Sequence, residues 1–106
     1  MNKEQMMGIA VQIIAYAGSA FDYFNQAIDA MENGDSDHME VCMEKGQSDL
    51  RNAHDAQTDL LAAEAKGEDL SFSILMVHAQ DHLTMAIFSE RMAKHFIALW
   101  NKERGD

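Results

Sequence analysis

The chain has 106 residues, and its 18 Asp and Glu outnumber its 8 Lys and Arg, giving a formal net charge of -10 at pH 7. So acidic a surface repels phosphate backbones, which excludes nucleic-acid binding. The absence of proline, the strongest helix breaker, favours an all-helical fold. The single cysteine precludes an intrachain disulfide, and no apolar run has the length of a signal-peptide core or a membrane span. We therefore expect one domain over residues 1–106, cytoplasmic and without membrane insertion.

Two glycine-containing turn signals divide the chain into three segments. They are Asn33–Ser36 and Lys66–Asp69, in which Gly34 and Gly67 can take the left-handed conformation that ends a helix. Polar residues after each glycine can cap the next helix: Asp35 or Ser36 for the second, and Asp69 or Ser71 for the third. The pattern predicts an antiparallel three-helix bundle with helices over about Lys3 to Glu32, Asp37 to Lys66 and Leu70 to Glu103.

The first two predicted helices each carry one apolar stripe with the three- and four-residue steps of an amphipathic helix. The stripe of the first helix consists of Met6, Ile9, Ile13, Ala17, Ala20, Phe24, Ala27, Ile28 and Met31. The stripe of the second helix consists of Met39, Cys42, Met43, Gly46, Leu50, Ala53, Gln57, Leu60 and Leu61. We expect both stripes to form the core.

The third predicted helix is apolar on more than one face. One stripe consists of Ile74, His78, Asp81, Met85, Phe88, Met92 and Phe96, and other apolar residues lie around it. A helix in a three-helix bundle buries only one side, so the surplus apolar face predicts a partner. In so small a domain, association of several copies is a plausible source of stability.

The sequence VHAQDH, Val77 to His82, places several chemically capable side chains near the start of this helix. His78, Asp81 and His82 share a face, whereas Gln80 points roughly 160° away from His82. A helix this apolar is normally buried, so we expect these polar groups to be buried too, at a cost that chemistry would explain. Neutral imidazole is a nucleophile suited to reversible phosphorylation or proton transfer, and the carboxylate could orient the ring or hold a cation.

We interpret the remaining candidate residues as structural. We interpret Asn52, His54 and Gln57 as a hydrogen-bonded polar layer on the second helix. We expect His38 and His95 at the surface, Cys42 buried as a small hydrophobe, and the acids between residues 32 and 44 on a solvated face. A purely structural role for the VHAQDH residues, as satisfied polar groups in a packed bundle, also stays open.

The chain resembles the IIA component of the lactose/cellobiose (N,N'-diacetylchitobiose) family of the bacterial sugar phosphotransferase system, over essentially its whole length. Three signatures carry the resemblance: IIAYAGSA from Ile13, NAHDAQTDLL from Asn52 and VHAQDHL from Val77. The last is the most specific, because the family motif around the phosphorylated histidine is H-[GA]-Q-D-H-L. The chain departs at Thr84-Met85, where relatives commonly have Met-Thr.

The resemblance implies a phosphoryl carrier whose acceptor is His78, with Gln80 and His82 as supporting residues. Such proteins take the phosphoryl group from HPr and pass it to a cysteine of the IIB component, which phosphorylates a disaccharide entering through IIC. The family forms homotrimers with the third helices at the centre, where three copies of Asp81 would bind one Mg²⁺. A cation there would also relieve the repulsion between three buried carboxylates.

Two other functions fit the residues. In the first, His78, His82 and Asp81 are the ligands of a zinc ion in a metal-binding bundle. In the second, the protein is a helical adaptor that uses the apolar face of its third helix and carries out no chemistry. The sequence identifies neither the sugar nor the particular IIB partner.

Overall fold

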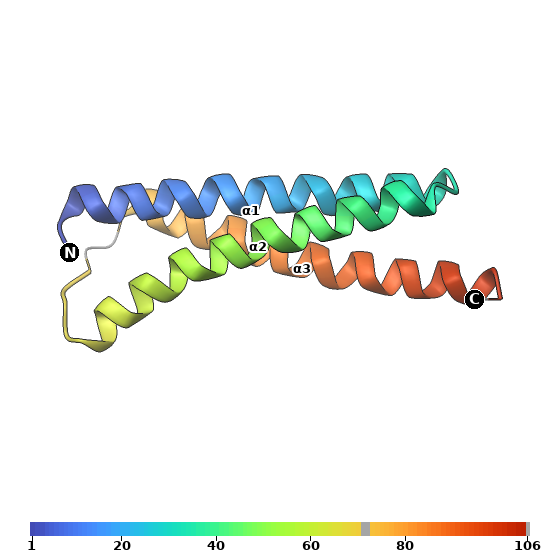
Figure 1. Ribbon diagram of the computed structural model, residues 1–106. Helices are drawn as coiled ribbons and strands as arrows, with labels where there is room; N and C mark the ends of the chain where they lie inside the picture. The colour runs from blue at the N-terminus through green and yellow to red at the C-terminus, as the bar shows by residue number, and fades with distance from the viewer. Residues whose placement is uncertain (71–72, 106) are drawn as a thin grey trace.

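The computed structural model describes residues 1–70 and 73–105, and within them the chain forms three helices and no strand. These are α1 (Lys3–Glu32), α2 (Ser36–Ala65) and α3 (Ile74–Glu103). They run antiparallel in an elongated bundle of 53 × 20 × 18 Å (Figure 1). The predicted all-helical class is confirmed. No helix in the described ranges is long and apolar enough to cross a membrane.

Local capping interactions set the helix ends. Asn2 and Gln5 form a capping box at the start of α1, and Asp35 accepts a hydrogen bond from the backbone N–H of His38 at the start of α2. Gly34 and Gly67 have φ values of 73° and 89°, as predicted for left-handed residues that end helices.

The predicted start of the third helix is wrong by four residues. The helix begins at Ile74 rather than Leu70, and its cap is Ser73, whose hydroxyl accepts from the backbone N–H of Met76 at 3.0 Å. The alternative cap Ser71 lies outside the described residues. Ser73 combines an extended backbone with a side-chain acceptor directly before the apolar run, which is what an N-cap requires.

Small residues on α1 bring the helices close together. Ala10, Ala17, Ala20 and Ala27 are buried on α1, and Phe24 fills the space opposite Gly46 of α2. The predicted stripes are largely confirmed, with one error: Leu61 is 59% exposed, because its neighbour Leu60 occupies the buried position. α1 packs against both other helices, whereas α2 and α3 contact each other much less. The C-terminal part of α2 diverges from α3 (Figure 1).

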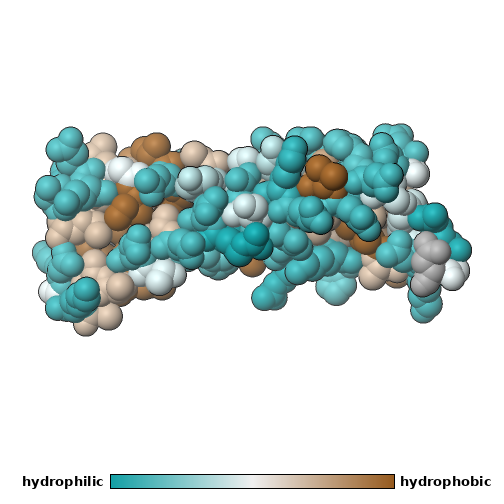
Figure 2. All heavy atoms as spheres, in the orientation of Figure 1, coloured by the Kyte–Doolittle hydropathy of each residue, from teal (hydrophilic) through white to brown (hydrophobic). Residues whose placement is uncertain are grey.

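Much of the apolar surface of α3 is exposed in the single chain. Ile74 is 89% exposed and Phe88 61%, and Val77, Met85, Phe96 and Leu99 are exposed as well. The face shown in Figure 2 is mainly hydrophilic, with apolar atoms near the end that holds the N-terminus and smaller apolar spots in the other half. The surplus apolar face predicted for the third helix is therefore present and unpartnered within the chain.

Candidate functional site

His78 and His82 form a direct pair on α3. They are one helical turn apart, their Nε2 atoms are 3.0 Å from each other, and the ring planes meet at 89° with centroids 4.4 Å apart. At this distance one nitrogen donates a proton and the other accepts it with its lone pair. A ring that accepts through Nε2 carries its lone pair there, which is the form of imidazole that acts as a nucleophile.

The expectation that these polar groups are buried within the chain is wrong. His78 and Asp81 are exposed and His82 is half-buried, because they lie on the side of α3 that faces away from α1. The exposed position removes the desolvation cost that the sequence pattern suggested. It leaves the imidazole of His78 open to a second macromolecule.

Asp81 does not complete a metal site with the two histidines. Among residues 1–70 and 73–105, no three side chains of His, Cys, Asp or Glu lie close enough together to hold a metal ion. The zinc hypothesis needs His78, His82 and Asp81 to act together in one chain, so the geometry does not support it. A site at Asp81 would need ligands from other copies of the chain.

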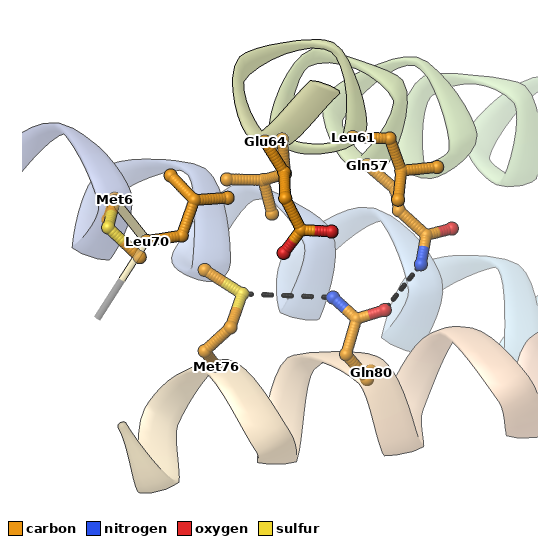
Figure 3. Close-up of a pocket in the computed structure, with 8 residues that line it drawn as sticks. Met6, Gln57, Leu61, Glu64, Leu70, Met76 and Gln80 are labelled. Atoms are coloured by element: carbon orange, nitrogen blue, oxygen red, sulfur yellow. Dashed lines mark hydrogen bonds between the residues drawn. The ribbon is translucent and has the colours of Figure 1, made fainter. Parts of the chain in front are cut away.

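Gln80 lies on the opposite side of α3, as its spacing from His82 predicted. Gln57 of α2 donates a hydrogen bond from Nε2 to Oε1 of Gln80, and Gln80 Nε2 donates to the Met76 sulfur at 3.7 Å (Figure 3). The pair joins the second sequence signature to the third, across helices that otherwise make few contacts. Gln80 thus stabilises, from the opposite side of the helix, the turn of α3 that carries His78. It belongs to a separate set of contacts from the imidazole pair.

The predicted polar layer on α2 is correct only at Gln57. Asn52 and His54 are exposed, whereas Gln57 is half-buried and bonds to Gln80 of α3. His38 and His95 are exposed, as expected, and the Sγ of buried Cys42 lies 3.6 Å from His38 Nε2. Burial raises the pKa of the Cys42 thiol, with a smaller lowering by Lys45 and a smaller rise from Asp35.

Two contacts between helices were missing from the sequence predictions. Ser19 of α1 donates a hydrogen bond to the Asp49 carboxylate of α2. Arg104 lies over the Trp100 ring at 4.2 Å and donates to Ser36 at 3.3 Å. Ser19 and Asp49 each directly precede a buried residue in the core stripe, which is the only signal in the sequence that could have suggested their pairing.

The sequence and the fold both match known phosphotransferase-system proteins. The family model described as the lactose/cellobiose-specific IIA subunit of the PTS matches residues 8–101. The lactose-specific EIIA component of Staphylococcus epidermidis is 40% identical over 102 residues, covering 96% of this chain and 98% of that protein. The corresponding protein of Lactococcus lactis is 38% identical over 102 residues, covering 96% of this chain and 97% of that protein.

Two solved structures share the fold along the chain. The cellobiose-specific enzyme IIA of Bacillus anthracis superposes with a TM-score of 0.90 at 32% identity, covering 100% of this chain and 95% of that one. PtcA from S. mutans superposes with a TM-score of 0.92 at 35% identity, covering 95% and 99% respectively. The family model, the related sequences and the superposed folds agree, and the chain belongs to the lactose/cellobiose-specific IIA family of the sugar phosphotransferase system.

Proposed function

We propose that the protein is a phosphoryl carrier in which His78 accepts the phosphoryl group from phospho-HPr and passes it to a cysteine of its IIB component. The transported sugar would be a disaccharide of the lactose, cellobiose or chitobiose class. The observation that carries the proposal is the exposed His78–His82 pair at the centre of the VHAQDHL signature, in a chain that belongs to this family. A single reduced cysteine, Cys42, fits a cytoplasmic location.

Each transfer exchanges one bond to phosphorus for another. A ring-nitrogen lone pair of neutral His78 attacks the phosphorus of phospho-HPr, and the N–P bond of the donor breaks as its electron pair returns to the donor imidazole. The thiolate of the IIB cysteine then attacks the phosphoryl group on His78, forming an S–P bond and restoring the imidazole. No further reactant is consumed in either step.

The neighbours of His78 suit this cycle. When His82 donates a hydrogen bond from Nε2 to Nε2 of His78, the proton of His78 lies on Nδ1 and its Nε2 carries the lone pair. His82 must release this hydrogen bond for the same lone pair to attack phosphorus. Gln80, tied to Gln57, fixes the same helical turn from the other side. His78 is exposed in the single chain, and access by two proteins in turn requires that the trimer proposed below leave its ring uncovered. The net charge of -10 suits basic docking faces on both proteins.

We further propose that the chain functions as a homotrimer with α3 at the centre. The exposed apolar residues of α3 supply the surface for this seam, and they share it with Asp81. A single chain offers one carboxylate there, and Asp81 has no ion-pair partner in the described part of the chain. Carboxylate oxygens are the ligands that Mg²⁺ prefers, so three copies of Asp81 would fit one Mg²⁺ per trimer. The ion would offset the repulsion between the carboxylates.

The adaptor hypothesis rests on the same apolar face of α3 and predicts association without phosphorylation. Intact-mass spectrometry distinguishes the two functions. After incubation with phosphoenolpyruvate, enzyme I and HPr, we expect one acid-labile phosphoryl group per chain, and its loss when IIB is added. A chain whose mass stays unchanged beside a phosphorylated HPr would contradict the carrier function and favour the adaptor.

A further inference from the structure

A small cavity lies at the end of the bundle where α2 diverges from α3. Its volume is about 150 Å³, and its apolar walls come from all three helices and the α2–α3 connection: Met6, Leu60, Leu61, Leu70 and Met76. An apolar cavity of about this size can hold a benzene-sized molecule. Met76 and Gln80 lie on the side of α3 opposite the exposed stripe of Ile74, His78 and Asp81, so the cavity is separate from the proposed trimer seam.

The polar groups of this cavity are gathered on one side and are rich in hydrogen-bond acceptors. Figure 3 shows the Glu64 carboxylate extending from α2 into the space between Met76 and Gln80. In the described part of the chain Glu64 has no ion-pair partner. The Gln57 amide donates to Gln80, and its carbonyl oxygen points away from Glu64 (Figure 3), so the Glu64 carboxylate is the acceptor nearest the apolar walls.

We propose that this cavity is a binding site for a short primary alkylammonium ion. The methylene chain would lie among Met6, Leu60 and Met76, where its burial removes apolar surface from water. The ammonium group carries three donors and one positive charge, which match the Glu64 carboxylate at the edge of the cavity. An anion is disfavoured by Glu64 and by the net charge of -10. The cavity lies on the side of α3 opposite His78, and the proposal does not depend on the proposed phosphoryl transfer.

The test uses the full-length protein with methyl-labelled methionine and n-pentylammonium chloride as the probe. We expect saturable NMR shifts at the methyl groups of Met6 and Met76, which line the cavity, and none at Met39, which is buried toward the other end of the bundle. 1-Pentanol, with the same tail and no charge, should bind more weakly, and so should tetramethylammonium, with charge and no tail. Non-saturating shifts, or equal affinities for pentylammonium and pentanol, would overturn the proposal.

A matched pair of variants separates the Glu64 contact from general attraction to an acidic protein. Glu64→Gln should weaken pentylammonium binding about two- to fivefold, the contribution of an ion pair at a solvent-exposed site. Asp59→Asn removes one charge from an exposed residue of the same helix that does not line the cavity, and should leave affinity unchanged. Equal losses in both variants would show that only net charge matters and would contradict the assigned site.

Discussion

At the scale of single residues, the chemistry depends on which imidazoles and thiols solvent can reach. His78 is exposed in the single chain and contacts His82, which suits its proposed role as phosphoryl acceptor. Cys42 is the reverse case, a thiol 1% exposed between α1 and α2. The difference follows from helix position, since His78 lies on the outer face of its helix and Cys42 on the inner face. Burial leaves Cys42 a packing residue.

We predict that Cys42 is protected from thiol reagents in the folded protein. Burial raises the pKa of its thiol, so less of the reactive thiolate is present, and the sulfur is also shielded. At about pH 8, reaction with an aromatic disulfide should be more than about tenfold slower in the native protein than in denaturant. Because the thiol pKa is higher in the folded state, the free energy of unfolding should fall as the pH rises past the unfolded-state pKa. Equal reaction rates in the two states would contradict this burial.

At the scale of helices, the packing of α1 against α2 depends on a missing side chain. A Cβ added at Gly46 would lie 2.6 Å from Cε1 of Phe24, whose ring is 0% exposed. The ring cannot move away without disturbing the core, so glycine is required at this close approach. Gly18 of α1 is different, since a Cβ there would meet nothing within 4 Å.

We predict opposite effects for alanine at these two glycines. Gly46→Ala should lower the free energy of unfolding by about 1–3 kcal/mol, the usual cost of overpacking a core. Gly18→Ala should raise it by about 0.5–1 kcal/mol, because alanine is the better helix former and has room. Urea denaturation followed by circular dichroism measures both. A Gly46→Ala protein as stable as the wild type would show that the Phe24 contact is not tight.

The sequence predicts features that depend on local interactions, such as helix ends. It does not predict contacts between segments that are distant in the chain. Gly34 and Gly67 end their helices as expected, because the left-handed conformation is a property of the residue itself. The N-cap of α3 is Ser73 rather than Asp69, because several residues before the helix can cap it and the local pattern does not rank them. The bond between Gln57 and Gln80 joins residues on different helices, so it depends on how α2 is aligned with α3. The motif identified His78, but its exposure could be seen only in the fold.

At the scale of the whole molecule, the single chain leaves an apolar face of α3 uncovered. α1 buries a continuous stripe, whereas α3 leaves Phe88, Phe96 and Leu99 exposed beside charged neighbours. Soluble monomers rarely expose an apolar surface of this extent along one helix. A symmetric assembly, in which each copy presents the same helix to its neighbours, would cover this surface.

We predict that the protein is a trimer at micromolar concentration and neutral pH. Association through α3 would bury the apolar side chains that a single chain leaves in water. Multi-angle light scattering should give three times the chain mass of 11.9 kDa. Phe88→Asp, which places a charge on the predicted seam, should shift the mass toward one chain, and Val41→Asp on the exposed face of α2 should not. A wild-type mass of one chain would contradict the assembly.

Asp81 should set the metal dependence of this trimer. If three carboxylates meet at its centre, chelation of the metal by EDTA should lower the thermal midpoint of the wild-type protein through uncompensated repulsion. Asp81→Leu removes the charges and adds apolar contact, so its trimer should be at least as stable without metal and insensitive to EDTA. Equal lowering of both midpoints by EDTA would show that the metal is not held by Asp81.

The most direct test of the carrier function is to replace the proposed acceptor. Glutamine at position 78 keeps the size and polarity of the side chain but has no ring nitrogen to bind phosphorus. We predict that His78→Gln, incubated with phosphoenolpyruvate, enzyme I and HPr, gains no phosphoryl group by intact-mass spectrometry, while its helicity and assembly equal those of the wild type. His54→Gln, a change at an exposed histidine of α2, should still be phosphorylated. Phosphorylation of His78→Gln to the wild-type extent would place the acceptor elsewhere and contradict the account.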